Sequence, residues 1–190
     1  MRRVLSAVLM MLVCLLLTSC SRAGNGTKDA LVFRERLVEQ NGCSFRANIV
    51  TEVDHRGYSF TLDAVYHCDA PTQISVSAPE TIRGISAEIT GRDAVISFDD
   101  VALDFGHLND AMTTPLYAPL VFGESWEEAY IDCGGMDGEE YRATYLLGYG
   151  TDELTVETWF RNGTPVRSEI YRDGKLLISA TVESFTFLVS

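Results

Sequence analysis

Basic residues are scarce in this sequence. Its 190 residues include 15 lysines and arginines against 27 aspartates and glutamates, with only 3 histidines. Without Arg2 and Arg3 near the start, the balance is 13 against 27, a net charge of −14. A surface that binds the phosphates of nucleic acid or of an anionic membrane needs clustered lysine and arginine. We therefore expect no nucleic-acid partner and no electrostatic docking on such a membrane.

Motifs of catalysis and metal binding are also lacking. In the segment His67-Cys68-Asp69, successive strand residues would point to opposite faces, so they form no metal site. Gly123-Glu124-Ser125-Trp126-Glu127 lacks the last glycine of a nucleophile elbow. The acidic residues between 124 and 140 lack the ligand spacing of a calcium loop. We expect no catalytic residue, no metal, no cofactor and no enzymatic activity.

The start of the chain is the most informative segment. Arg2 and Arg3 precede a nearly unbroken apolar run from Val4 to Leu17, which is the layout of a secretory signal peptide. A membrane-spanning helix needs about 20 apolar residues, so the run is too short to span a bilayer. Residues 1–19 are therefore expected to be a signal peptide that is removed.

Leu17-Thr18-Ser19-Cys20 resembles the lipobox of bacterial lipoproteins, in which small residues precede a cysteine that is acylated on sulfur before cleavage. The resemblance implies that Cys20 becomes the lipidated first residue of the mature protein, palmitate being one such acyl group. Its acyl chains would hold the protein to a membrane on the extracytoplasmic face. The alternative is an ordinary secretory signal that contains a cysteine. Residues 20–28 are polar and typical of a flexible tether, which leaves 29–190 as a single domain.

Two alternating runs predict a long hairpin around residues 54–57. With His55 and Arg56 as the loop, apolar or small residues face each other across the strands. The predicted pairs are Val53 with Tyr58, Thr51 with Phe60, Ile49 with Leu62, Ala47 with Ala64, Phe45 with Tyr66 and Cys43 with Cys68.

The predicted register bears on the cysteines of the domain, Cys43, Cys68 and Cys133. It places Cys43 opposite Cys68 in a non-hydrogen-bonded pair, where Cα atoms are about 4.5 Å apart and within disulfide range. We predict a disulfide between these two cysteines. The alternative is two reduced thiols that are buried as small hydrophobic side chains.

The rest of the domain shows one helical and several strand patterns. Residues 27–40 predict an amphipathic helix, with Ala30, Phe33, Leu37 and Val38 near one face. Residues 107–138 predict loops with one or two short helices. Antiparallel strands are expected at 72–78, 85–89, 95–98, 101–105, 141–147, 153–160, 166–171 and 175–189. The sequence predicts an α+β fold, mainly antiparallel β, with nine or ten strands.

Three segments carry a resemblance to a known superfamily. They are Phe45-Arg46-Ala47-Asn48-Ile49, Ser77-Ala78-Pro79-Glu80 and Asn162-Gly163-Thr164-Pro165. With the element order of residues 27–189, they resemble the lipoprotein carriers LolA and LolB and the mycobacterial LppX-like proteins. The resemblance implies a curved, unclosed half-barrel with an N-terminal helix and an inserted short-helix lid over an apolar cavity that accepts acyl chains.

The residues themselves lead to a compatible hypothesis, because one helix and one apolar insert can cover only part of the apolar face of a sheet with so many strands. In this hypothesis Phe45, Ile49, Phe60, Leu62 and Tyr66 line an apolar concavity, with Leu116, Leu120 and Phe122 as mobile cover. The alternative is that the same residues form a filled core. We expect an anchored cell-envelope protein that binds or carries a hydrophobic ligand, or else a non-enzymatic module that uses the sheet to hold an envelope protein.

Overall fold

A computed structural model describes residues 26–53, 56–98, 101–107 and 114–189. The predicted signal peptide, Cys20, most of the predicted tether and the loop residue His55 lie outside the described residues. Within the part that is described, no helix has both the length and the apolar character needed to cross a bilayer.

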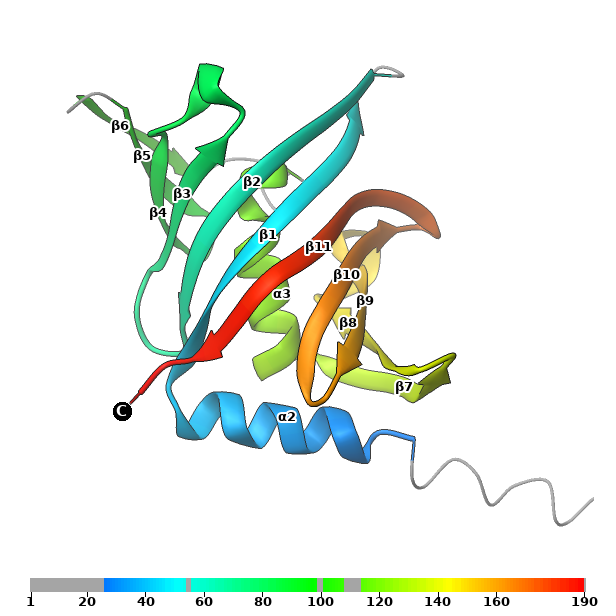
Figure 1. The fold of residues 1–190 in the computed structure, drawn as a ribbon. Helices are drawn as coiled ribbons and strands as arrows, with labels where there is room; N and C mark the ends of the chain where they lie inside the picture. Colours follow the sequence, from blue (N-terminus) through cyan, green and yellow to red (C-terminus); the bar gives the residue numbers. More distant parts are fainter. Residues whose placement is uncertain (1–25, 54–55, 99–100, 108–113, 190) are drawn as a thin grey trace, which may run out of the picture.

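One antiparallel sheet of eleven strands forms the domain (Figure 1). Its strand order is β6-β5-β4-β3-β2-β1-β11-β10-β9-β8-β7. The pairing of β1 with β11 brings the first and last strands of the domain together in the middle of the sheet. The sheet is curved and does not close, so β6 and β7 are its two edges. The predicted fold class, an α+β unclosed half-barrel, is confirmed.

The strands comprise β1 (Gly42–Val53), β2 (Arg56–His67), β3 (Thr72–Ala78), β4 (Ser86–Thr90), β5 (Asp93–Phe98), β6 (Val101–His107), β7 (Tyr130–Asp137), β8 (Glu140–Leu147), β9 (Leu154–Arg161), β10 (Thr164–Arg172) and β11 (Lys175–Phe187). The helices are α2 (Lys28–Glu39) and α3 (Ala118–Glu127), with 3-10 turns η2 (Glu80–Ile82), η4 (Pro115–Tyr117) and η5 (Gly150–Asp152).

Helix α2 lies across one end of the sheet (Figure 1). It buries Ala30, Phe33 and Leu37, which recur at helical spacing. Val38, which was expected on the same face, is 51% exposed because it lies beyond the edge of this apolar stripe. The helix predicted over residues 27–40 is otherwise confirmed.

Helix α3 lies on the concave side of the sheet, between its two halves (Figure 1). It packs against β2 and β3 on one side and β8 on the other, and α2 also contacts it. Eight of its ten residues are buried, in keeping with an apolar sequence that has little polar face. The inserted helix therefore supplies the main cover of the concave face.

Strand β7 was not predicted, because residues 107–138 were expected to form loops with one or two short helices. Gly134 and Gly135 interrupt any alternation, and as an edge strand β7 exposes residues on both faces. Gly134 is also required by packing, since a Cβ atom there would lie 2.2 Å from the carbonyl oxygen of Gly26. The predicted total of nine or ten strands is accordingly too low.

The β1–β2 hairpin forms as predicted, but its predicted register is wrong by two residues. Thr51 pairs with Tyr58 and Ile49 with Phe60, and Val53 pairs with Arg56, so only residues 54–55 connect the two strands. A shift of two keeps every side chain on its predicted face. The observed register also places Arg46 opposite Asp63, where two hydrogen bonds of 2.7 and 2.9 Å join the side chains. This ion pair distinguishes the two registers, whereas apolar matching does not.

The structure contains no disulfide between Cys43 and Cys68. In the observed register Cys43 pairs with Tyr66, and Cys68 follows the end of β2. Both thiols are free, as is the exposed Cys133. Cys43 is completely buried, which agrees with the alternative of a reduced thiol packed as a small hydrophobic side chain.

Candidate functional site

The lower part of the concave face, near α2, is filled by the indole of Trp126. The side chain is completely buried and contacts the rings of Phe33, Phe45, Phe122 and Phe185 at centroid distances of 5.6 to 6.1 Å. Its Nε1–H donates a 3.0 Å hydrogen bond to Oγ1 of Thr158. This part of the half-barrel is packed with the chain's own side chains.

Most of the residues predicted to line a ligand cavity lie in this packed core. Fewer than a tenth of the side-chain surface is exposed at Phe45, Ile49, Leu62, Tyr66, Leu120 and Phe122. Phe60 and Leu116 are only partly buried against the core. The structure thus separates the predicted set into a buried majority and two residues that face partly open space.

The upper part of the concave face, at the end of the sheet opposite α2, is less covered. Burial alternates along β5, where Ala94 is buried and Ile96 is half-buried, so Phe98 lies on the same inner face. On β6, Leu103 pairs with Ile96 and Val101 pairs with Phe98, which places both on that face as well. We call the six inner-face residues of this region the apolar mouth: Tyr58, Phe60, Ile96, Phe98, Val101 and Leu103.

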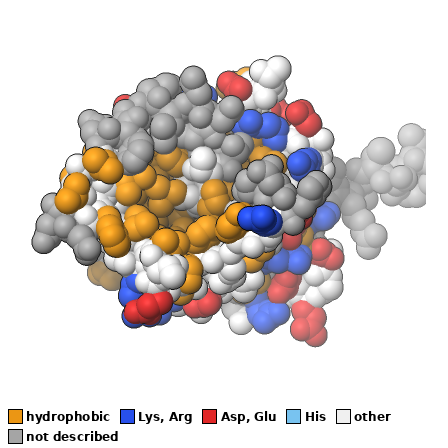
Figure 2. Space-filling model, turned by 90° about the horizontal axis from the view of Figure 1, so that it is seen from above, with side chains coloured by type: hydrophobic (Ala, Val, Ile, Leu, Met, Phe, Trp, Pro, Cys, Tyr) orange, Lys and Arg blue, Asp and Glu red, His pale blue; other side chains and the backbone are white. Residues whose placement is uncertain are grey.

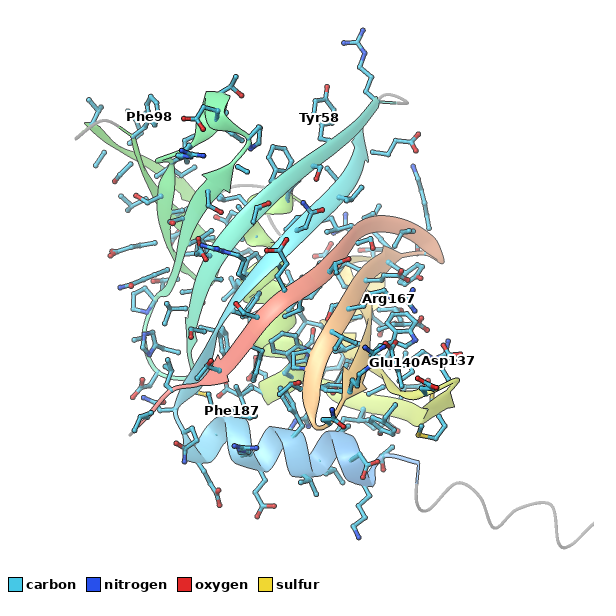
Figure 3. All side chains as sticks on the ribbon, viewed as in Figure 1. Tyr58, Phe98, Asp137, Glu140, Arg167 and Phe187 are labelled. Atoms are coloured by element: carbon cyan, nitrogen blue, oxygen red, sulfur yellow. The ribbon has the colours of Figure 1, made fainter. Side chains whose placement is uncertain are left out.

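The side chains of the apolar mouth are unusually exposed for their type. Tyr58 is 42% exposed and Phe98 45%, and Val101 and Leu103 are 59% and 57% exposed. Figure 3 shows Tyr58 and Phe98 at the end of the molecule away from α2. Figure 2, which looks down on that end, shows hydrophobic side chains gathered around a hollow. Grouped apolar exposure of this kind marks a binding surface more often than isolated exposed residues do.

At the other end of α3, carboxylates meet a buried tyrosine. Tyr66 donates a 2.5 Å hydrogen bond to Glu127. Burial, followed by the nearby carboxylates of Glu128 and Glu127, raises the pKa of Glu124 to about 7. Arg34 of α2 donates to the carbonyl oxygens of Ser125, Trp126 and Ala129 at the end of α3. These contacts fix the C-terminal end of α3 to α2 and β2.

The residue types considered for chemistry are not brought together as a reactive site. In the described segments, no group of three or more histidine, cysteine or acidic side chains is arranged to hold a metal ion. Burial raises the pKa of Cys43 far above its usual range, and raises that of Cys68 to about 12. Both thiols are therefore protonated at neutral pH and are poor nucleophiles.

Five residues of the apolar mouth were missed at the level of sequence, namely Tyr58, Ile96, Phe98, Val101 and Leu103. The signal for the last four was available, because they alternate symmetrically on either side of residues 99–100. The strand pairs place all four on one face of the β5–β6 hairpin. Alternation alone, however, does not reveal which part of an apolar face is left uncovered.

A scan against protein-family models finds no match for this chain, and a search of curated proteins finds none. Among solved structures, a LolA superfamily protein from Nitrosomonas europaea is similar, with a TM-score of 0.47 and 12% identity, over 85% of this chain and 94% of that one. LprF from Mycobacterium bovis is similar at a TM-score of 0.41 and 11% identity, over 86% and 95% of the chains.

The lipoprotein LppX from Mycobacterium tuberculosis is similar at a TM-score of 0.38 and 11% identity, over 85% of this chain and 97% of that one. These structures include the LolA-like and LppX-like proteins that the sequence was expected to resemble. At such identities and TM-scores, the similarity concerns the general fold and carries no argument about function.

Proposed function

We propose that this protein binds a hydrophobic ligand, such as an acyl chain, at the apolar mouth and acts as a membrane-anchored carrier without catalysing a reaction. The observation that carries the proposal is the exposure of Phe98, Val101 and Leu103 on the inner face of the sheet. Covering this apolar surface with a ligand would gain about 25 cal/mol for each Å² removed from water. No residue of the mouth is ionisable except Tyr58, which suits a ligand without charge along its length.

In this proposal, the ligand occupies only the upper part of the half-barrel. The buried Trp126 and Phe122 form the floor, and Phe60 and Leu116 lie at the boundary between core and open space. The ligand would then not contact the deeper residues that were expected to line its cavity, because they pack in the protein's own core: Phe45, Ile49, Leu62, Tyr66 and Leu120. A ligand that penetrated further would have to displace α3.

The proposal includes lipidation of Cys20 and a location at the extracytoplasmic face of a membrane. Five residues lie between Cys20 and Gly26, so Cys20 can be at most about 20 Å from Gly26. The described chain begins beside α2, at the end of the molecule opposite the apolar mouth (Figure 1). An anchor at Cys20 would therefore direct the mouth away from the anchored membrane, where it could exchange ligand with a soluble partner or a facing membrane.

Native mass spectrometry of the full chain, purified from membranes in mild detergent, tests both parts of the proposal. We expect an N-terminal peptide that carries acyl chains on Cys20, and a second, non-covalent lipid that is released on unfolding. A protein without any non-covalent hydrophobic ligand, which also fails to bind an added fatty acid, would contradict the carrier function.

A second candidate is an envelope-protein interaction module, and the edge strand β7 favours it. An edge strand offers unpaired backbone groups to an added strand, and β7 also exposes Tyr130 and Met136 by 67% and 69%. Crosslinking on intact cells distinguishes the two. One dominant partner protein crosslinked to β7, with no lipid released, would favour the interaction module.

A further inference from the structure

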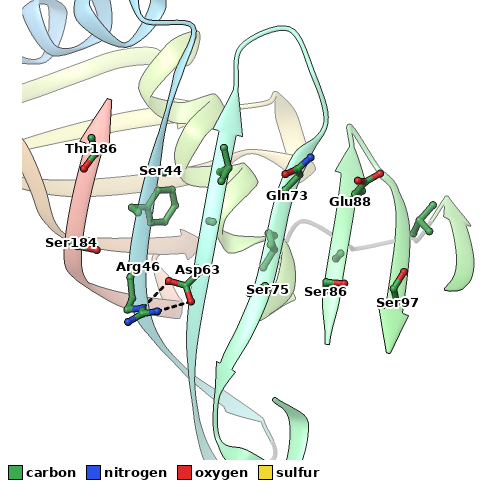
Figure 4. Close-up of a pocket in the computed structure, with 16 residues that line it drawn as sticks. Ser44, Arg46, Asp63, Gln73, Ser75, Ser86, Glu88, Ser97, Ser184 and Thr186 are labelled. Atoms are coloured by element: carbon green, nitrogen blue, oxygen red, sulfur yellow. Dashed lines mark hydrogen bonds and ion pairs between the residues drawn. The ribbon is translucent and has the colours of Figure 1, made fainter. Parts of the chain in front are cut away.

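The outer face of the sheet carries a second hollow, which the proposed carrier function does not use. It has a volume of about 620 Å³ and runs across β11, β1, β2, β3, β4 and β5. The apolar mouth lies on the inner face of the sheet, on β2, β5 and β6, so the two surfaces are on opposite faces of the sheet. Figure 4 shows the polar side chains of this outer groove.

Strand register explains why the outer groove is polar and regular. Arg46 pairs with Ser184 on one side and Asp63 on the other. The same row then continues from Asp63 through three serines on three successive strands, which are Ser75, Ser86 and Ser97. Adjacent strands are about 4.8 Å apart, so the hydroxyl groups recur at that spacing. Small side chains in this row leave the groove its depth.

A second row runs parallel to the first, two residues away along each strand. It contains Thr186, Ser44, Val65, Gln73, Glu88 and Val95. Both rows line the hollow. Together they present hydroxyl, amide and carboxylate groups in a single track, interrupted by Val65 and Val95.

The hydrogen-bonding capacity of this track is largely unused. In the described part of the chain, the only side-chain hydrogen bonds among the groove residues are the two between Arg46 and Asp63. The serines, Gln73 and Glu88 keep their donors and acceptors available to a ligand. Arg46 and Asp63 neutralise each other, since both are engaged in a bidentate ion pair.

These features select one class of ligand. The single arginine is already paired, which disfavours phosphate and other anions, and the polar lining disfavours lipids. An extended peptide binds to backbone groups at a sheet edge, whereas this groove lies on the face of central strands. A neutral saccharide carries closely spaced hydroxyl groups that both donate and accept hydrogen bonds, which matches the hydroxyls and amide of the track.

We propose that the outer groove binds a neutral saccharide chain, with Ser75, Ser86 and Gln73 as hydrogen-bonding contacts. The site would give the protein a second attachment, to a carbohydrate, that is independent of the apolar mouth. It requires no movement of α3 and no ligand in the mouth.

Titration of the ¹⁵N-labelled protein, residues 21–190, with maltohexaose, cellotetraose or chitotetraose tests this proposal by NMR. We expect saturable shifts of amide signals along β3 and β4 with at least one of these saccharides. Ser86→Tyr, which fills the groove, should weaken binding at least about tenfold. Thr181→Tyr places the same side chain on the exposed outer face of β11 but outside the groove, and should leave binding unchanged.

Thermal melts of both variants test whether the substitutions preserve the fold, and Gln73→Leu replaces Ser86→Tyr if that variant does not fold. A Val101→Ser variant should bind the saccharide normally, which separates this site from the proposed carrier function. The proposal is overturned if none of the three saccharides causes a saturable shift, or if the shifts map to the apolar mouth.

Discussion

The Cα atom of Gly123 faces the ring of Tyr66 so closely that a Cβ atom at Gly123 would lie 2.1 Å from Cδ2 of the ring. Gly123 is in α3 and Tyr66 is in β2, so this contact sets how deeply the helix enters the concave side of the sheet. The hydrogen bond from Tyr66 to Glu127, one turn further along α3, holds the ring in place.

Gly123→Ala should therefore destabilise the protein, although alanine favours helix by about 1 kcal/mol over glycine. Overpacking typically costs about 1–3 kcal/mol, so we expect a net decrease in the free energy of unfolding measured by urea denaturation. Gly57→Ala is the control, because a Cβ atom there meets nothing within 4 Å. Equal stability of the two variants would show that α3 does not pack on Tyr66.

The raised pKa of Glu124 predicts that stability depends on pH. Its pKa is about 7 in the folded protein against 4.5 for the ordinary group, chiefly because of burial. The folded state therefore binds more protons between these values, and the free energy of unfolding should fall as pH rises from about 4.5 to 7. The contribution of this group is at most about 3 kcal/mol.

Glu124→Gln should remove this part of the pH dependence and stabilise the protein at pH 8. Urea denaturation at several pH values measures it. Glu39→Gln, at an exposed position in the last turn of α2, is the matched control and should retain the slope. A wild-type protein whose stability rises steadily across this pH window, with an unchanged slope in Glu124→Gln, would contradict the assignment.

The apolar mouth predicts which valines matter for hydrophobic binding. Val101→Ser should weaken the binding of a fluorescent fatty acid by about fivefold, because it removes about 1 kcal/mol of apolar contact. Val50→Ser changes a valine that is 45% exposed on the outer face of β1, and it should bind the probe as the wild type does. Equal effects of the two variants would argue against the mouth as the binding surface.

The three thiols predict an order of chemical modification. Cys133 is exposed, whereas Cys43 is completely buried and its pKa is raised by burial. Iodoacetamide should label Cys133 first, and Cys43 only on unfolding. Peptide mapping without reduction should find Cys43 and Cys68 unlinked, and a crosslinked peptide containing both would refute the free thiols of the structure.

The strands and helices that the sequence predicted well are those with a simple burial pattern. Residues 72–78 alternate between buried and exposed along most of their length, and β3 has the same bounds as the prediction. Strand β7 lacks such a pattern because an edge strand with two adjacent glycines has no buried face to produce one. An edge strand without regular alternation therefore leaves no local pattern from which it can be predicted.

The register of the first hairpin and the location of the candidate site depend on pairs that are distant in sequence. Apolar matching tolerates a shift of two residues, and the contact between Arg46 and Asp63 is present only in the observed register. Ile49 and Phe98 are both apolar residues on the inner face of a strand, yet one is completely buried and the other is 45% exposed. Ile49 is in β1, in the middle of the sheet, whereas Phe98 is in β5, next to the edge strand β6, and no local sequence pattern contains that information.

The pairing of β1 with β11 has a consequence for how the domain is made. Cys43 and Phe187 face each other across the middle of the sheet although nearly the whole domain lies between them in sequence. Joining such distant segments is entropically costly and slow, so the two flanking meanders can form early while the seam between them closes last. A chain that lacks β11 would be left as two unjoined half-sheets, so pairing of β11 with both β1 and β10 is what joins the domain into one sheet.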